Sequence, residues 1–315
     1  MATALVSFEE HNLHNEPSHS ENAERVNAIL KAIGSSKLPL LHLKARKAAK
    51  EEIIKVHSNE FYDYLSKPAF EVIGALTRFN DELYSGDTYF TDRTFEAALF
   101  SAGSVLTAID AVKEGRAKNA FALSRPPGHH AEKEEAKGFC FFNNIAIAAR
   151  YAQGKGFSKV FILDFDVHHG NGTQHIFYED NSVFYCSTHQ WPLYPGTGKA
   201  DETGEGKGRG FTLNIPLKAG TTSERYLELM KEKIIPAIDS FKPDILLISA
   251  GFDAHKDDPL GDLELDAECY GRMAEMLKAS AEKYCNGRII FSLEGGYNVK
   301  ALADSALEVL KSLSA

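Results

Sequence analysis

Short runs of consecutive apolar residues recur along the chain, between longer stretches in which apolar residues return every three or four positions. Each run is too short for an isolated helix, and continuous apolarity is typical of strands buried on both faces in a parallel sheet. We therefore predict strands in four runs: AFALS from residue 120, KVFILDF from 159, DILLISA from 244 and RIIFSLE from 288. Two further runs, VFYCSTH and GFTLNIPL, are candidates to extend the sheet.

The segment over residues 91–115 has the clearest helical pattern. Its apolar residues follow a spacing of three to four, capping residues open it, and Gly115 closes it. Weaker patterns of the same kind predict helices near residues 22–33, 50–66, 143–153, 222–240, 266–285 and 300–313.

This alternation of strands and helices predicts an α/β fold. We expect a single domain over residues 1–315, with a mostly parallel central sheet, helices on both faces and the active site at the C-terminal ends of the strands. A chain of 315 residues with 43% hydrophobic content can bury a large core. No Pro/Ser-rich linker and no internal repeat interrupts the pattern.

Composition narrows the classes of partner and compartment. The net charge of −9 argues against direct nucleic-acid binding through a basic face. The N-terminal stretch is too briefly apolar and too acidic for a secretory signal, and no run has the length of a membrane span, so we expect a cytoplasmic protein without a membrane partner. Four cysteines without CxxC spacing predict reduced thiols: Cys140, Cys186, Cys269 and Cys285.

A polar or glycine-rich cluster follows each of the four main apolar runs directly. The clusters read RPPGHHA, DVHHGNG, GFDAHKDDPLG and GGYN in chain order. In open α/β sheets a ligand site forms at the carboxyl ends of the strands, where the following loops converge. The four clusters are therefore predicted to share one pocket.

Three side chains in these clusters have the character of a metal site. Asp166 and His168 lie two residues apart, and Asp253 follows the next of the four runs. Two carboxylates and one imidazole balance a divalent cation and leave positions open for water and substrate, as in catalytic zinc sites. The plainer alternative is that Asp166 and His168 only cap the following helix. His255, close to Asp253, keeps a second metal open as a further alternative.

The adjacent imidazoles of His129 and His130 suit proton transfer near neutral pH. Asp164 and Asn171 are the candidate partners that would orient them. A metal-binding pair or a surface loop is the competing interpretation. Tyr297, after two glycines, is a candidate hydrogen-bond donor to a developing oxyanion, although many such tyrosines only pack in a turn.

Taken together, the motifs RPPGHHA, GFCFFNN, DFDVHHGNGTQ, STH…YPGTG, AGFDAHKDDPLG and LEGGYN resemble those of the histone deacetylase and acetylpolyamine amidohydrolase family. The resemblance runs from about residue 11 to residue 300 and keeps the order of the motifs. Asn171 and Glu294 resemble the class II branch. The resemblance implies an arginase-like α/β fold, a catalytic zinc ion and hydrolysis of an N-acyl amide.

The resemblance also implies roles for individual residues. Asp166, His168 and Asp253 would hold the zinc, and Tyr297 would polarise the acyl carbonyl. His130, backed by Asn171, would be the general base and acid, and His129 with Asp164 an electrostatic partner. Gly138, Phe139 and Tyr194 would line the substrate channel, together with Gly295 and Gly296. A potassium ion would bind at the main-chain carbonyls of Asp164, Asp166 and His168 and the hydroxyl of Ser187, and Arg25 would lie near an internal product exit.

Two rival functions share this set of residues. A binuclear manganese ureohydrolase would need a carboxylate four residues after Asp166, where Gly170 stands. A non-catalytic acyl-amine binder would not need the full set of acid, base and metal ligands. Between substrates, acetyl-lysine of proteins or peptides is our first expectation and an acetylated polyamine the alternative, because rim loops such as 80–90, with Asp87 as a candidate, decide between them. The sequence leaves the oligomeric state open.

Overall fold

A parallel sheet of eight strands forms the centre of the protein in the computed structural model, which describes residues 2–69, 71–72 and 88–315. Its strand order is β2-β1-β3-β8-β7-β4-β5-β6, and every described pair is parallel. Asp87 lies outside the described residues. The strands are β1 (Thr3–Ser7), β2 (Leu40–Lys44), β3 (Asn119–Ala122), β4 (Val160–Asp164), β5 (Val183–Gln190), β6 (Thr212–Leu217), β7 (Ile245–Ala250) and β8 (Ile289–Leu293).

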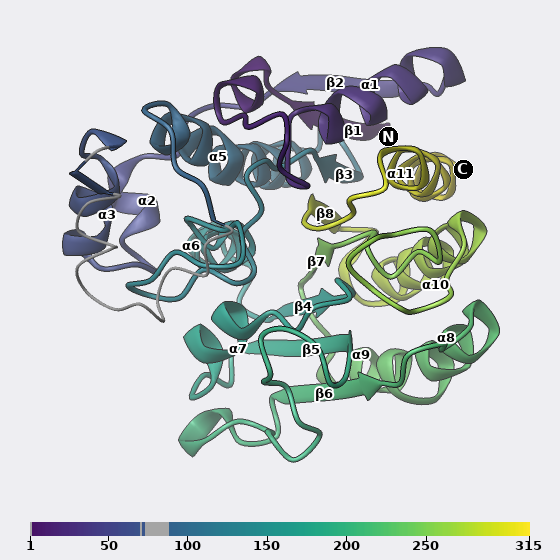
Figure 1. Cartoon of the computed structure of the whole chain (residues 1–315). Coiled ribbons are helices and arrows are strands. Elements are labelled where there is room, and N and C mark those ends of the chain that lie inside the picture. Colours follow the sequence, from purple (N-terminus) through teal and green to yellow (C-terminus); the bar gives the residue numbers. More distant parts are fainter. Residues whose placement is uncertain (1, 70, 73–87) are drawn as a thin grey trace.

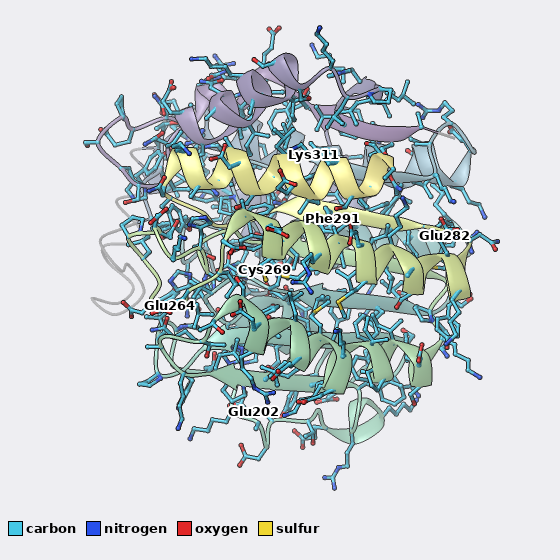
Figure 2. The ribbon with its side chains drawn as sticks, turned by 90° about the vertical axis from the view of Figure 1, so that its right-hand side faces the viewer. Glu202, Glu264, Cys269, Glu282, Phe291 and Lys311 are labelled. Atoms are coloured by element: carbon cyan, nitrogen blue, oxygen red, sulfur yellow. The ribbon has the colours of Figure 1, made fainter. Side chains whose placement is uncertain are left out.

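Helices cover both faces of this sheet. Figure 1 shows α5, α6 and α7 on one side and α8, α10 and α11 on the other. On the second side α10 and α11 lie next to each other across the sheet (Figure 2). The helices are α1 (Glu24–Ser36), α2 (Lys50–Ile53), α3 (Asn59–Leu65), α5 (Thr94–Lys113), α6 (Asn144–Gly154), α7 (Asn171–Phe177), α8 (Ser223–Leu229), η3 (Met230–Ile234), α9 (Ile235–Phe241), α10 (Ala267–Cys285) and α11 (Val299–Ser314), with short η1 (Glu9–Leu13) and η2 (Gly206–Gly208).

The continuous apolar runs are explained by two separate cores. Along β4, Phe161 and Leu163 pack in the core under α8 to α11, whereas Val160 and Ile162 pack in the core under α5 and α6. Successive side chains of a strand point to opposite faces, so a strand covered on both sides must be apolar at every position. The predicted α/β class, the parallel sheet and the helices on both faces are confirmed.

All six predicted strands are present, but the sheet is larger than expected. β1 and β2 extend it at one edge and were missed. No residue of β2 is fully buried, and its exposed His42 and Lys44 interrupt the continuous apolar pattern. The four cysteines are free, as predicted, and all of them are buried.

Two helix predictions need correction. The stretch 50–66 is two short helices, because Ser58 is extended and caps α3 by accepting from the Phe61 N–H. The stretch 222–240 is helical but passes through a π turn, η3, between α8 and α9. This wider turn precedes Pro236, which has no N–H for an α-helical bond.

The chain changes direction within the sheet at β4. From β4 the next two strands, β5 and β6, are added on one side, whereas β7 lies on its other side and leads to β8. Such a switch point leaves a crevice at the carboxyl ends of the strands. The loops after β4 and β7 therefore meet at this crevice.

Helix α5 is long and apolar enough to cross a membrane by length and composition alone. However, 78% of the relevant window is buried inside the protein, where it packs against β1, β3 and α6. This degree of burial is typical of the central helix of a globular fold.

Gly103→Ala in α5 is expected to destabilise the protein by about 2 kcal/mol or more, because the new methyl group would lie 1.8 Å from the carbonyl oxygen of Arg46. The clashing atoms belong to the backbone of Arg46 and Ala48, so they cannot rotate aside as a flexible side chain could. Urea unfolding measures the change. Gly34→Ala in α1 is the matched control: no atom lies within 4 Å of the new methyl group, and a gain of about 0.5–1 kcal/mol is expected. Equal effects of the two changes would contradict the packing argument.

Candidate active site

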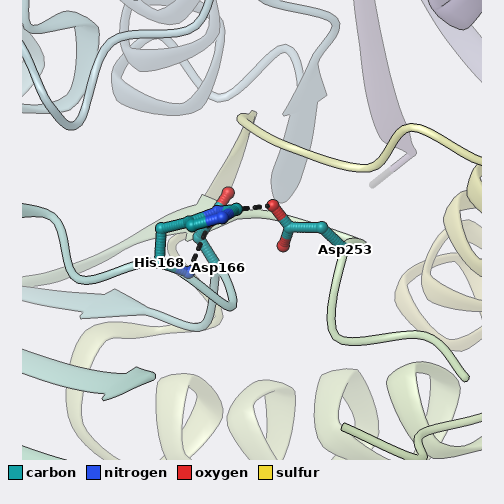
Figure 3. A group of neighbouring side chains, drawn as sticks. All are labelled: Asp166, His168 and Asp253. Atoms are coloured by element: carbon teal, nitrogen blue, oxygen red, sulfur yellow. Dashed lines mark hydrogen bonds and ion pairs between the residues drawn. The ribbon is translucent and has the colours of Figure 1, made fainter. Parts of the chain in front are cut away.

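Asp166, His168 and Asp253 meet at the crevice between β4 and β7 (Figure 3). One ligand atom from each lies within 4.8 Å of the others. Nδ1 of His168 is 3.1 Å from Oδ1 of Asp166 and 3.2 Å from Oδ2 of Asp253. Among the described residues, no other group of His, Cys, Asp and Glu has this geometry.

The charges of this group call for a cation. Both carboxylates are buried, and burial, followed by the negative charge of Asp166, raises the pKa of Asp253 to about 7. Backbone N–H groups fix the carboxylates: Val167 donates to Asp253 at 2.8 Å, and Gly295 donates to Asp166 at 2.8 Å. Two carboxylates and one imidazole are the donor set that a divalent cation such as zinc accepts, with positions left for substrate and water. The residues therefore fit a single catalytic metal.

A second metal would lack the carboxylate ligand that it needs at position 170, where there is no room for a side chain. A side chain at Gly170 would begin 2.1 Å from Oδ2 of Asp164 and 2.6 Å from the hydroxyl of Tyr185. His255, the other candidate ligand, accepts the Asp257 N–H with Nδ1 at 3.1 Å and is not part of the metal group. The described residues therefore provide one metal group, not the pair that a binuclear ureohydrolase needs.

His129 and His130 lie side by side with opposite electrostatic surroundings. Nδ1 of His129 is 3.0 Å from Oδ2 of Asp164, which also accepts the Tyr185 hydroxyl at 3.1 Å. Burial opposes a charge on His129, but Asp164 and then Asp166 outweigh it and raise its pKa to about 10. Burial, followed by the charges of His129 and His168, holds the pKa of His130 well below its usual value. The surroundings thus favour a positive charge on His129 and disfavour one on His130.

The predicted partner of His130 is in place. Nδ1 of His130 is 2.8 Å from Oδ1 of Asn171, which is buried at the start of α7. Gly138 packs directly on the His130 ring, and a side chain there would begin 2.4 Å from Cδ2. The ring of Tyr194 meets the same imidazole edge-on at 5.0 Å. His130 is therefore held in one orientation from three sides.

Tyr297, in the loop after β8, lines the same cavity as His130 and His168. Its N–H donates to Oδ2 of Asp258 at 2.6 Å, and the guanidinium of Arg25 lies 5.0 Å from the centre of its ring. Arg25 is fully buried and also donates to the carbonyls of Gly296 and Glu294, so it holds this loop from behind. Burial raises the pKa of Tyr297 well above its usual value, which keeps the phenol protonated as a donor.

These groups open into one cavity of about 240 Å³. At its mouth Tyr194 is 38% exposed, and Phe139 has a φ of +68°, with its N–H held by the hydroxyl of Thr88 at 3.1 Å. Such a backbone conformation is uncommon outside glycine and marks a side chain held in place by its neighbours. The lining residues are His130, Gly138, Phe139, His168, Tyr194, Leu260 and Tyr297.

Gly295 and Gly296, expected to contact substrate, do not line this cavity. A side chain at Gly295 would begin 2.1 Å from Oδ2 of Asp253, and the Gly296 carbonyl accepts from Arg25. These glycines therefore allow the loop after β8 to approach the metal group closely. The expected potassium ligand Ser187 is fully buried on β5, paired in register with Asp164, and its hydroxyl lies 2.9 Å from Nδ1 of His189.

Sequence reasoning missed several residues that support the site. Leu260 lines the cavity seven positions after Asp253, inside the motif AGFDAHKDDPLG. Glu294 accepts the Gly128 N–H at 2.7 Å and so holds the loop of His129 and His130, and burial raises its pKa to about 7. Tyr185 and Asp258 stand inside quoted segments, VFYCSTH and AGFDAHKDDPLG, but their contacts with Asp164 and Tyr297 join distant parts of the chain and could not be predicted.

The chain is similar to known proteins over most of its length. Residues 19–313 match the model of the histone deacetylase domain. The chain is 39% identical to a probable deacetylase of Archaeoglobus fulgidus, over 100% of this chain and 87% of the relative. It is 42% identical to the chloroplastic histone deacetylase 14 of Arabidopsis thaliana, over 95% and 74%. It is 36% identical to a histone deacetylase-like amidohydrolase of Pseudomonas aeruginosa, over 94% and 77%.

A solved structure extends the likeness to the whole fold. The crystal structure of the HDA15 HD domain superposes with a TM-score of 0.90 at 38% identity, and the match covers 99% of this chain and 88% of the other. The fold is thus the arginase- and deacetylase-like α/β fold that the motifs predicted. With the family model covering most of its length, the chain belongs to the histone deacetylase family.

Proposed function

We propose that this protein is a zinc-dependent deacetylase that hydrolyses the acetyl amide of acetyl-lysine in a protein or peptide. One observation carries the proposal: His168 of the metal group, the imidazole of His130 and the phenol of Tyr297 line the same cavity. Relatives named deacetylase or amidohydrolase support the reaction class. Both rivals are less well supported, the binuclear enzyme because of the crowding at Gly170 and the pure binder because the acid-base groups are complete.

Amide hydrolysis needs a polarised carbonyl, an activated water and a protonated leaving amine. Asp166, His168 and Asp253 would hold the zinc, which when bound supplies Lewis-acid polarisation and lowers the pKa of water. Nε2 of His130 accepts the proton of the attacking water and then donates it to the leaving nitrogen. Water thus adds across the C–N bond to give acetate and a free amine.

The remaining polar groups stabilise charge along this path. The Tyr297 hydroxyl donates a hydrogen bond to the oxygen that becomes negative as the carbonyl is attacked. His129, charged against Asp164, adds a fixed positive charge next to His130 and favours the neutral form of that base. His130 and Tyr297 therefore contact the reacting atoms directly. His129 acts only electrostatically, through its positive charge next to His130.

The cavity supports a thin aliphatic substrate. We propose that Gly138, Phe139 and Tyr194 flank the methylene chain, that Leu260 adds to this wall, and that the loop of Gly295 and Gly296 supports the acetyl end. We also propose a structural potassium ion at the carbonyls of Asp164, Asp166 and His168 with Ser187, one catalytic domain over residues 1–315, and a cytoplasmic location without nucleic-acid or membrane partners.

Acetate release from zinc-loaded protein tests the function. We expect turnover of acetyl-lysine peptides, and higher kcat/KM on them than on acetylated polyamines matched for chain length. Tyr297→Phe keeps the ring but removes the donor, so kcat is expected to fall about a hundredfold or more. A higher kcat/KM on the polyamines would contradict acetyl-lysine as the proposed substrate. Binding of acetylated ligands without any acetate release would show that the protein is a binder and not an enzyme.

A further inference from the structure

The side chain of Asn171 lies between two groups that need opposite ends of its amide. Oδ1 is 2.8 Å from Nδ1 of His130, and Nδ2 is 2.5 Å from Oε1 of Glu132. A longer contact of 3.3 Å joins Nδ2 to the His130 carbonyl. Asn171 is buried, so neither end of its amide is left to water.

These contacts admit only one arrangement of protons. The NH2 end of Asn171 faces the Glu132 carboxylate and the backbone carbonyl of His130, and a carbonyl oxygen can only accept a hydrogen bond. The oxygen end must then face His130, and an oxygen only accepts. Nδ1 of His130 therefore carries the hydrogen, and Nε2, the other ring nitrogen, keeps its lone pair.

We propose that Glu132 is a positioning residue that fixes the orientation of the Asn171 amide and thereby the tautomer of His130. The inference deepens the proposed function and rests on it, since Nε2 of His130 is the proton acceptor in that reaction. If the amide were reversed, its NH2 would donate to Nδ1, and the ring proton would move to Nε2. The base would then have no lone pair at the nitrogen that needs one.

Glu132 is well placed to hold this orientation. Its side chain is 18% exposed, and the same Oε1 that accepts from Asn171 also lies 2.8 Å from Nδ1 of His175, which is about half exposed. Asn171 and His175 are one turn apart on α7, so one short helix presents both partners to the carboxylate. Glu132 also lines a separate surface depression, which shares no lining residue with the substrate cavity; the other lining residues are Lys133, Glu134, Glu135, Lys137 and His175.

The role is orientation and not proton relay. An amide NH2 and an amide oxygen do not exchange protons readily, so a proton on His130 has no route to Glu132 through Asn171. The carboxylate acts instead by making one of two amide orientations far more stable. Partners that orient metal-binding imidazoles from behind are worth about ten- to a hundredfold in activity, and we expect an effect of the same order at His130.

The first experiment compares Glu132→Ala and the isosteric Glu132→Gln with the wild type, all loaded with zinc. Glu132→Ala is expected to lower kcat by about tenfold or more, with KM within about twofold and zinc content unchanged. Glu132→Gln is expected to lower kcat less, because its amide can present either its oxygen or its NH2 to Asn171. Glu134→Gln is the matched control, because it removes the same charge from an exposed position on the same loop, and wild-type kcat is expected. Unchanged kcat in both Glu132 variants overturns the proposal.

A direct readout of the tautomer is the 15N chemical shift of the two His130 ring nitrogens. Wild-type protein is expected to show the proton on Nδ1, and Glu132→Ala a mixture of both tautomers. A single Nδ1–H tautomer in both proteins overturns the proposal. This measurement needs no substrate, so it decides the role of Glu132 even if acetate release fails and the proposed function is wrong.

Exchanging the amide and the carboxylate between positions 171 and 132 distinguishes a role in orienting His130 from a purely structural role. Asn171→Asp alone puts two carboxylates in contact, and a loss of kcat is expected. Adding Glu132→Gln restores a matched pair with the amide and the carboxylate exchanged. The glutamine NH2 then donates to one oxygen of the new carboxylate at position 171, and the other oxygen accepts from Nδ1 of His130. The double variant is expected to exceed Asn171→Asp at least about tenfold in kcat. Equal or lower activity of the double variant overturns the proposal.

Discussion

Removal of the metal with a chelator is expected to abolish acetate release, and one equivalent of zinc per chain to restore it. The carboxylates and the imidazole of the metal group cannot polarise an amide carbonyl by themselves, because none of them is a Lewis acid. Metal analysis of the purified protein and the activity of chelated and reloaded samples check this expectation. Two metal ions per chain, or full activity of metal-free protein, would contradict it.

Asp253→Asn tests the metal group from the protein side. It keeps the shape of the side chain but removes one of two charges that balance the cation, so zinc content and activity are expected to fall together. Asp257→Asn is the matched control, because this carboxylate stands in the same loop but its side chain is 62% exposed. A normal zinc content in Asp253→Asn would remove this residue from the ligand set.

The second large effect is expected at His130. Replacement by alanine should lower kcat by about 10³- to 10⁴-fold, because the same imidazole supplies both proton transfers. Zinc content should stay at the wild-type level, since His130 is not among the three metal-binding side chains. Steady-state kinetics together with metal analysis separate loss of chemistry from loss of the ion.

His129→Gln is the comparison for this experiment. His129 does not line the cavity and acts through its charge against Asp164, so its replacement is expected to lower kcat less than replacement of His130. A larger loss in His129→Gln than in His130→Ala would exchange the two roles. Wild-type turnover in His130→Ala with zinc bound would contradict the mechanism itself.

The local pattern of apolar residues was sufficient to predict the inner strands of the sheet. A strand covered on both faces must be apolar at each position, so β3, β4, β7 and β8 could be recognised without any knowledge of their neighbours. No residue of the edge strand β2 is fully buried, and its exposed His42 and Lys44 interrupt the apolar pattern. The helix expected over 50–66 failed for another local reason, since Ser58 stabilises a new helix start where the apolar spacing continues.

The candidate site was predictable where its chemistry is concentrated in short motifs. Asp166 and His168 stand two residues apart, and His129 and His130 are adjacent, so each pair was visible in the sequence. The supporting contacts were not visible in this way. Glu132 and Asn171 are 39 residues apart, and Asp258 reaches Tyr297 across another 39, with no pattern that joins them.

The sequence by itself determined the α/β class, the parallel sheet and the kinds of side chain at the strand ends. Burial on two faces requires an apolar residue at every strand position, and metal binding requires particular residue types, so both leave a pattern within a short segment. Only the tertiary structure decided which of these side chains share a cavity, that Gly170 leaves no room for a second metal ligand, and that Glu132 stands behind the base. The reason is geometric: distances of a few ångströms between loops depend on the register and packing of the whole sheet, and no short segment of the chain contains that information.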